Sequence, residues 1–398
     1  MGDMSELNER MPYVTAFPRA LGTGMIVRTS RPICDDLHAA MSSFIDDYER
    51  TLSRFRNDST VAAMGQAAHG GTFDFPAWTI ALFDLYDALC DATDGAIDPC
   101  VGEDLIRLGY GADYSFTVEP GADGRLGAIH GRPTWRSDVE RRGAGGATLA
   151  THRPVHLDFG ACGKGYLVDL LAQRFLADSS DNIKSSANHS DTTIDEGLAT
   201  AQHDNSNGAS STTTTGSEPL EFVIDVGGDL LVRSSQPITI ALEDPANTSR
   251  AIGTASVSSG AFCASAPSRR RWEQHSENGG IPGTNTIVHH LLNAIDGLPV
   301  RNVAATWTSV GIVDDDHRTA ASASDCTDNV IDPSIGSRDF DARTHPTALA
   351  DGLATALFVA DPNHLAARFP GLFDCAILNA DRTLAASRNF PGTFFTHQ

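Results

Sequence analysis

The segment at residues 155–169 constrains the fold of this chain more than any other. A short apolar run ends at Asp158, three glycines and Lys164 follow within seven residues, and apolar residues at helical spacing come next. This order predicts a strand that turns tightly through glycines into a helix. Such a helix start presents backbone N–H groups to an anion, and a lysine there can reach phosphate oxygens. Because the chain has only two lysines among 29 basic residues, and Lys184 lies in a polar stretch, Lys164 indicates a site that needs an ammonium group.

The composition limits the partners of this site. The net charge of −22 argues against non-specific binding to nucleic acid and against insertion at an anionic membrane surface. An anionic ligand therefore needs a local positive site or a metal. The seven cysteines have no CxxC spacing, and residues 1–21 lack the apolar core of a signal peptide or lipoprotein signal. We therefore expect reduced thiols, no membrane span and a cytoplasmic location.

Helical and strand patterns are mixed along the chain, which predicts an α+β (mixed α/β) fold. Hydrophobic periodicity predicts helices at 35–55, 76–91, 164–176 and 346–359, and strands at 22–29 and 221–231. The stretches 179–219 and 314–345 are polar and low in complexity, which predicts two disordered insertions. We expect a single compact core at 20–362, in one or two lobes, and an extension of that core at 363–398.

The helix expected at 346–359 carries a carboxylate and a hydroxyl one turn apart. Asp351 and Thr355 are spaced i, i+4 and therefore share one face. Such hard oxygen ligands suit Mg²⁺, which keeps waters and borrows phosphate oxygens. The alternative needs no metal: Asp351 caps the first turns of the helix and Thr355 bonds back to a carbonyl.

Several other motifs allow both a ligand-binding and a purely structural interpretation. Phe55, between two arginines, can stack on a ring system or serve as a hydrophobic staple. His290 is expected at a strand end, where a histidine can act as a base or simply pack. The remaining motifs are the small-residue turn at 95–99, the turn Gly227-Gly228-Asp229, and Ser265 with the arginines at 269–271.

Taken together and in order, these motifs make the chain similar to the FAD:protein FMN transferase family, also called thiamine-biosynthesis lipoproteins. The likeness covers residues 22–362 apart from the two insertions. It implies a flavin-transferase-like fold, FAD as substrate, Mg²⁺ as cofactor and an acceptor flavoprotein as partner. By this resemblance the metal ligands are the carbonyl of Ala161, the carboxylate of Asp351 and the hydroxyl of Thr355, with Ala354 adjacent.

The resemblance also assigns FAD contacts, and the implied transfer to a hydroxyl needs a base. Lys164 and Asp158 correspond to FAD contacts, and Phe55 to the aromatic residue against the flavin nucleotide. The further FAD contacts implied are Leu21, Ala96, Ile97, Asp98 and Leu292. Asp351, His290 or a metal-bound water is the candidate base.

The sequence departs from the family pattern without losing a metal ligand or Lys164. Asn293 and Ala294 replace a common Asp-Pro, Ala266 replaces a glycine, and Phe159 and Cys162 are variants. The implied reaction is transfer of FMN from FAD to a Ser or Thr hydroxyl with release of AMP. Two alternatives remain open: hydrolysis of FAD to FMN and AMP, and flavin binding without catalysis.

Overall fold

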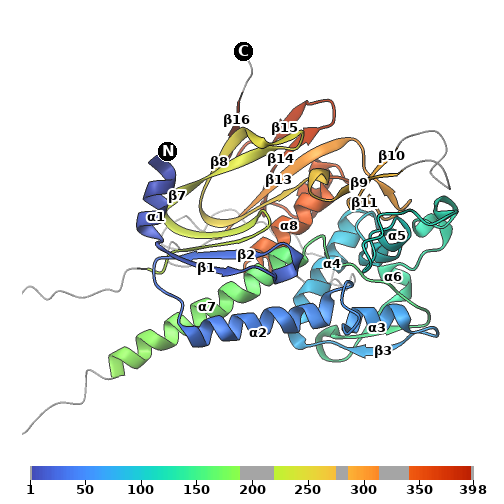
Figure 1. The fold of residues 1–398 in the computed structure, drawn as a ribbon, viewed down its shortest axis with the longest axis horizontal. Coiled ribbons are helices and arrows are strands. Elements are labelled where there is room, and N and C mark those ends of the chain that lie inside the picture. Colours follow the sequence, from blue (N-terminus) through green and yellow to red (C-terminus); the bar gives the residue numbers. More distant parts are fainter. Residues whose placement is uncertain (1, 189–218, 275–285, 313–339, 396–398) are drawn as a thin grey trace, which may run out of the picture.

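One large antiparallel sheet organises the fold in this computed structural model, which describes residues 2–188, 219–274, 286–312 and 340–395. Within those residues, eight strands follow in the order β1-β2-β6-β7-β8-β13-β14-β15, and β16 pairs with β8 (Figure 1). The strands are β1 (Tyr13–Phe17), β2 (Met25–Thr29), β6 (Phe222–Val226), β7 (Asp229–Asp244), β8 (Asn247–Ser265), β13 (Val303–Gly311), β14 (Asp374–Asn379), β15 (Leu384–Ala386) and β16 (Gly392–Phe394). The N-terminal, central and C-terminal parts of the chain thus share one layer.

The turn between β6 and β7 places a carboxylate at the start of β7. Gly227 and Gly228 both have positive φ, a conformation that glycine adopts without strain. The side chain of Asp225 accepts a hydrogen bond from the N–H of Gly228 at 3.1 Å and closes the turn. Asp229 comes next and lies opposite Cys263 of β8. The buried strand and Gly-Gly-Asp turn expected at 221–231 are therefore confirmed.

Helices α7 (Gly163–Asn188) and α8 (Pro346–Ala356) pack on the sheet and against each other. α7 contacts β6 and β7, whereas α8 contacts β8 and β13. α8 is almost wholly buried, as its small and apolar composition requires. Helix α2 (Asp35–Leu52) packs beside α7 on its apolar face, and the two run side by side below the sheet in Figure 1.

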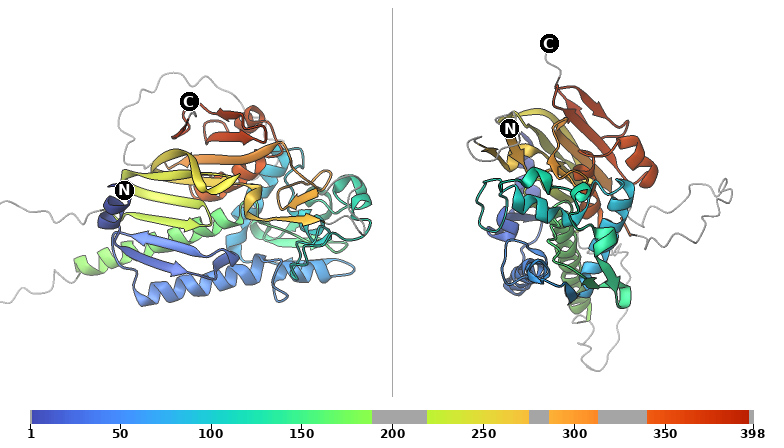
Figure 2. Two further views of the ribbon diagram at one scale, coloured as in Figure 1. Left: turned by 45° about the horizontal axis from the view of Figure 1, so that its top comes forward. Right: turned by 90° about the vertical axis from the view of Figure 1, so that its right-hand side faces the viewer.

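A second group of shorter elements lies at one end of the sheet (Figure 2, left). Its helices are α3 (Thr60–Gln66), α4 (Ile80–Ala92), α5 (Gly102–Arg107) and α6 (Trp135–Asp138). Its strands are β3 (Gly71–Asp74), β4 (Glu140–Arg142), β5 (Thr148–Thr151), β9 (Arg271–Gln274), β10 (Thr286–His289), β11 (Leu292–Asn293) and β12 (Leu298–Pro299). The remaining helices are α1 (Gly2–Arg10) against β7 and α9 (Pro362–Arg368) against α4. The mixed helices and antiparallel sheets confirm the predicted fold class.

The structure corrects the strand expected before the glycines. Val155 and Leu157 are fully buried, as their apolar character predicts, but the segment is irregular. Its backbone bonds to other partners instead of a neighbouring strand. The N–H of Val155 donates to the carbonyl of Met64 at 3.4 Å, and the N–H of Asp158 donates to that of Pro99 at 2.6 Å. The helix that follows begins at Gly163, as the glycine pattern indicates.

The polar insertions lie largely outside the described residues. Of the stretch 179–219, residues 179–188 form the end of α7, which corrects the expectation of disorder there. Residues 189–218 and 313–339 lie outside the described part, and 340–345 form a turn before α8. Among the helices in the ranges described, none combines the length and hydrophobicity needed to cross a membrane.

Candidate functional site

Lys164 lies between two buried carboxylates from different parts of the chain. Its Nζ is 2.6 Å from Oδ2 of Asp229 and 3.1 Å from Oδ1 of Asp351. Both carboxylates are 1 % exposed, whereas the lysine side chain is 31 % exposed. Lys164 is in the first turn of α7, Asp229 starts β7 and Asp351 lies on α8. The junction of two helices and one strand therefore forms the centre of the site.

The close approach of α7 and α8 fixes this geometry. The N–H of Gly165 donates to Oδ2 of Asp351 at 3.1 Å. A Cβ atom at Gly165 would lie only 2.2 Å from the carbonyl oxygen of Thr347, so the helices can approach this closely only at a glycine. Further along α7, the carboxylate of Asp169 accepts hydrogen bonds from the N–H groups of Thr347 and Ala348. It thereby satisfies the first turn of α8, where His345, the residue before the helix, offers no side-chain cap.

The charges at the centre shift each other's protonation. Burial and the nearby carboxylate of Asp229 raise the pKa of Asp351 to about 7, although Lys164 lowers it. Burial lowers the pKa of Lys164, but the two carboxylates more than offset this, so that pKa stands above its usual value. The ammonium is therefore charged at neutral pH and stabilises negative charge on its partners.

Two neutral oxygen atoms meet beside this cluster. The hydroxyl of Thr355 donates a hydrogen bond to the carbonyl oxygen of Ala161 at 3.3 Å, across 194 positions of sequence. Ala354 precedes Thr355 in α8 and is fully buried. Its carbonyl oxygen accepts a hydrogen bond from the hydroxyl of Thr306 at 2.6 Å. Three of the four predicted metal-binding residues thus offer an oxygen near the start of α7, whereas the Ala354 carbonyl already has a partner on β13.

An arginine and a set of aromatic rings flank the loop before α7. The guanidinium of Arg54 forms an ion pair with Asp158 and lies 4.1 Å from the centroid of the Phe55 ring. Phe55 in turn stacks on Tyr114, with ring centroids 5.2 Å apart and an interplanar angle of 6°. The ring of Tyr110 lies at the edge of Phe55, at a centroid distance of 5.4 Å. These contacts give Asp158 and Phe55 a common, partly exposed setting suited to a flat charged ligand.

His290 lies directly after β10, at the strand end that the sequence predicts. Its Nδ1 is 3.2 Å from the carbonyl oxygen of Arg270, so Nδ1 carries the hydrogen and Nε2 keeps its lone pair. Burial lowers the pKa of His290 to about 4, and Lys164 and Asp158 both act on it electrostatically. The imidazole is therefore neutral at pH 7 and can accept a proton.

The other predicted flavin contacts lie in two places. Leu21 has a positive φ of 51°, and its N–H donates to Oε1 of Glu49 at 2.7 Å. Thr23, in the same loop, lies beside Gly227, where an added Cβ atom would be 3.3 Å from the Thr23 hydroxyl. This loop therefore adjoins the turn before Asp229.

The second place joins the predicted 96–98 segment to the loop after His290. The N–H of Ala294 donates to the carbonyl of Ala96 at 3.0 Å, which brings Leu292 close to that segment. Ala96, Ile97 and Leu292 are all buried. Asp98 is buried too, and its carboxylate accepts hydrogen bonds from the N–H groups of Cys100 and Trp135. The side chain of Asp98 thus supports the local backbone.

The structure adds residues that the sequence analysis did not place in the site. In the sequence, Asp229 is marked only by its place in a Gly-Gly-Asp turn after a buried strand. Arg54, one of the two arginines beside Phe55, forms an ion pair with Asp158, and nothing in the sequence marks this pairing. Tyr110 and Tyr114 had no sequence signal, because their contact with Phe55 joins segments more than 50 residues apart.

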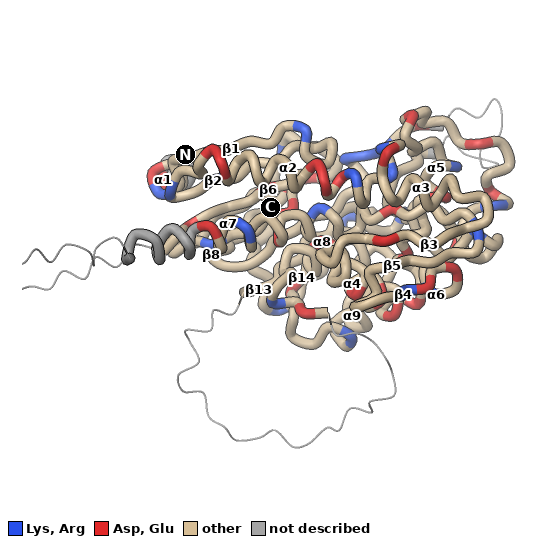
Figure 3. The backbone as a smooth tube through the Cα atoms, turned by 90° about the horizontal axis from the view of Figure 1, so that it is seen from below, with Lys and Arg blue, Asp and Glu red and all other residues tan. Residues whose placement is uncertain are grey.

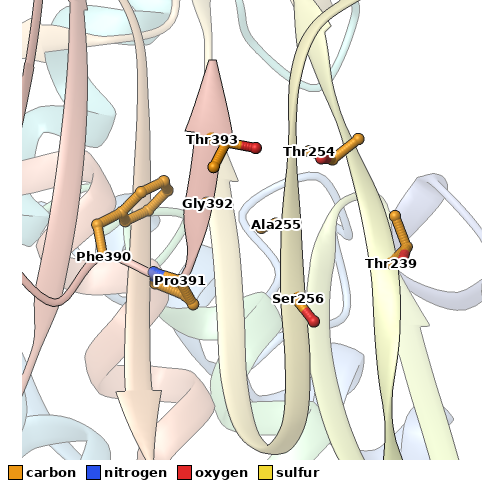
Figure 4. A pocket seen from close by; sticks show the side chains of 8 residues that line it. All are labelled: Thr239, Thr254, Ala255, Ser256, Phe390, Pro391, Gly392 and Thr393. Carbon is orange, nitrogen blue, oxygen red and sulfur yellow. The ribbon is translucent and has the colours of Figure 1, made fainter. Parts of the chain in front are cut away.

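A hollow on the opposite part of the sheet is unrelated to this cluster. It lies between β7, β8 and β16 (Figure 4), and the residues that line it include Thr239, Thr254, Ser256, Phe390, Pro391 and Thr393. Its polar side chains are hydroxyls only, and none of the predicted site residues contributes to it.

Charge is spread over the rest of the molecule. Figure 3 shows acidic and basic residues interspersed along the described chain. Across the residues described, no group of three or more His, Cys, Asp or Glu side chains could hold a metal ion. A cation at the junction of α7 and α8 would therefore need hydroxyl or carbonyl oxygens besides its carboxylates.

Comparison with known proteins identifies similar chains. The sequence profile of the ApbE family matches residues 21–184 and 218–330. The fold is similar to that of the ApbE protein from Thermotoga maritima, with a TM-score of 0.65 and 18% identity over 95% of this chain and 97% of that one. The apo form of the flavinyl transferase ApbE from Pseudomonas stutzeri has a TM-score of 0.60 at 18% identity, over 94% and 95% of the two chains. The flavin transferase ApbE from Vibrio cholerae has a TM-score of 0.60 at 16% identity, over 95% and 97%. No curated protein sequence matches this chain.

Proposed function

This chain belongs to the ApbE family, and we propose that it is a transferase that moves FMN from FAD to a Ser or Thr hydroxyl of a target flavoprotein, releasing AMP. One observation carries the proposal. Four residues separated by up to 194 positions meet where α7 and α8 approach each other, namely Lys164, Asp351, Ala161 and Thr355. This junction supplies an ammonium group and a set of oxygen ligands, which suits a diphosphate with a divalent cation.

The residues present fit Mg²⁺. The ammonium of Lys164 already lies between two buried carboxylates, so the position favours positive charge. The carboxylate of Asp351, the hydroxyl of Thr355 and the carbonyl of Ala161 are hard oxygen donors that would hold the ion, with Ala354 adjacent. When bound, Mg²⁺ would neutralise charge on the diphosphate and on the departing AMP.

The flanking residues suit FAD. Lys164 would bind a phosphate oxygen as a point charge. Asp158 is held by Arg54, and Phe55 offers an aromatic surface for a ring of the flavin nucleotide. Leu21, the 96–98 segment and Leu292 complete the proposed contacts from the two neighbouring loops.

In the proposed reaction, the acceptor hydroxyl attacks the phosphorus on the riboflavin side of the diphosphate. A new P–O bond joins FMN to the protein, and the bond from that phosphorus to the bridging oxygen breaks. The bridging oxygen leaves with AMP. The hydroxyl proton goes to a base, for which neutral His290 is one candidate and Asp351 another.

The test is to incubate the protein with FAD, Mg²⁺ and candidate flavoproteins, and to search for an FMN adduct on Ser or Thr by mass spectrometry. Asp351→Ala is expected to abolish the adduct, whereas Asp123→Ala, at an exposed carboxylate, should leave it intact. An active Asp351→Ala variant would refute the proposal. Rapid AMP release without an acceptor would indicate hydrolysis instead, and FAD binding without turnover would indicate a flavin-binding protein.

A further inference from the structure

Asp229 has the shortest contact to Lys164, yet nothing in the proposed reaction requires it. Its carboxylate lies 2.6 Å from the ammonium, compared with 3.1 Å for Asp351. It is 1 % exposed, and apart from this contact with Lys164 neither of its oxygens has a hydrogen-bond partner within the described residues. Burying a charged carboxylate destabilises the folded state unless the charge is paired. The ion pair with Lys164 offsets this cost for Asp229.

The backbone around Asp229 holds it firmly. Asp229 follows two glycines with positive φ and pairs with Cys263 in the centre of the main sheet. Asp351 lies on the other side of Lys164, on a helix that packs on that sheet. The lysine therefore has one anchor on the sheet and another on the helix.

We propose that Asp229 is a positioning residue: it keeps Lys164 at the site when Asp351 holds the divalent cation. This inference rests on the proposed function. Asp351 cannot hold a lysine ammonium and a divalent cation equally well, because the two cations repel each other. With Asp229 present, Lys164 retains a carboxylate partner and remains available to a phosphate oxygen. Without Asp229, Lys164 depends on Asp351 alone and competes with the cation for it.

This role predicts a specific pattern of Mg²⁺ affinities. Asp229→Asn should weaken Mg²⁺ binding about fivefold or more, because Lys164 then opposes the cation at Asp351. Replacing the lysine as well, in the double variant Lys164→Met/Asp229→Asn, should restore most of the affinity. If Asp229 were itself a metal ligand, the loss would be the same with or without Lys164.

The experiment is calorimetric titration of the full chain with MgCl₂, without FAD, for the wild type, both single variants and the double variant. Asp225→Asn is the matched control, because Asp225 lies in the same turn but bonds to Gly228 and not to Lys164. Its Mg²⁺ affinity should equal that of the wild type. Circular dichroism shows whether each variant is folded.

The outcomes separate the two proposals. Rescue by Lys164→Met supports the positioning role, and an equal loss in both backgrounds overturns it, as does an Asp229→Asn variant with unchanged affinity. If Asp229→Asn does not fold, the Mg²⁺ affinities of Lys164→Met and of the double variant are compared instead. A much lower affinity in the double variant would mean that Asp229 is itself a metal ligand and would overturn the positioning role, whereas equal affinities support it. A wild-type protein that binds no Mg²⁺ either without FAD or with it would contradict the proposed function itself.

Discussion

Gly165→Ala tests whether the close contact between α7 and α8 maintains the site. The Cβ of the alanine would lie 2.2 Å from the carbonyl oxygen of Thr347, 2.6 Å from its carbonyl carbon and 3.0 Å from the nitrogen of Ala348. All three are backbone atoms in the first turn of α8, so the rotation of a side chain cannot relieve the clash. The helices must separate by about 1.2 Å to restore a normal contact of 3.4 Å.

The magnitude follows from two opposing effects. Overpacking against backbone costs about 3 kcal/mol, and replacing glycine by alanine inside a helix returns about 1 kcal/mol. We therefore expect the free energy of unfolding to fall by about 2 kcal/mol. The same displacement lengthens the contacts of Asp351 with Gly165 and Lys164, and a misplacement of about 1 Å at a catalytic site costs about 100-fold in rate.

Equilibrium unfolding in urea measures the stability, and formation of the FMN adduct measures the activity. Gly163→Ala is the matched control, because a Cβ there meets its nearest atom, the Tyr48 hydroxyl, at an ordinary 3.5 Å. It should be at least as stable as the wild type and equally active. If Gly165→Ala matched Gly163→Ala in both measurements, the contact would not control the site and this reasoning would be wrong.

Three further predictions concern the surroundings of the site. Arg54→Lys should weaken FAD binding about tenfold in a flavin fluorescence titration, because a lysine ammonium cannot bond Asp158 and the carbonyl oxygen of Tyr110 together as the guanidinium does; unchanged binding would contradict this role. Tyr48→Phe should lower the free energy of unfolding by about 1 kcal/mol, since it removes the buried hydrogen bond to the carbonyl of Gly163; urea titration tests this. Burial lowers the pKa of His345 from 6.5 to about 4, so its contribution to stability is present above pH 6.5 and is lost as the pH falls toward 4. His345→Gln should therefore make the acid loss of stability shallower in unfolding curves at pH 7, 5.5 and 4.5, and an unaltered pH dependence would count against it.

The local elements of this fold could be predicted from the sequence because their signals are local. Apolar residues at helical spacing located α2, which ends at Leu52, slightly before the expected 55. The same reasoning located α8 from Pro346, with its end at Ala356 instead of 359. It failed at 155–157, where buried apolar residues look like a strand but the backbone bonds to Met64 and Pro99.

The site could be predicted only where a family pattern joined distant residues. Neither the turn at Gly228 nor Asp229 carries any information on which lysine it will meet, because that pairing depends on how β7 lies against α7. The same holds for Arg54 and Asp158, which are 104 positions apart. Charge partners chosen by tertiary packing leave no periodic trace in a sequence.

The lysine between two carboxylates also bears on the order in which the protein matures. Two buried carboxylates that lacked a cation would repel each other and oppose folding. Here the chain supplies its own cation, and the ammonium of Lys164 offsets part of this repulsion without a metal. Many small metalloproteins, by contrast, fold only when the metal binds. If the proposed function holds, Mg²⁺ would therefore bind to a chain that is already folded, and folding would not depend on the supply of the metal.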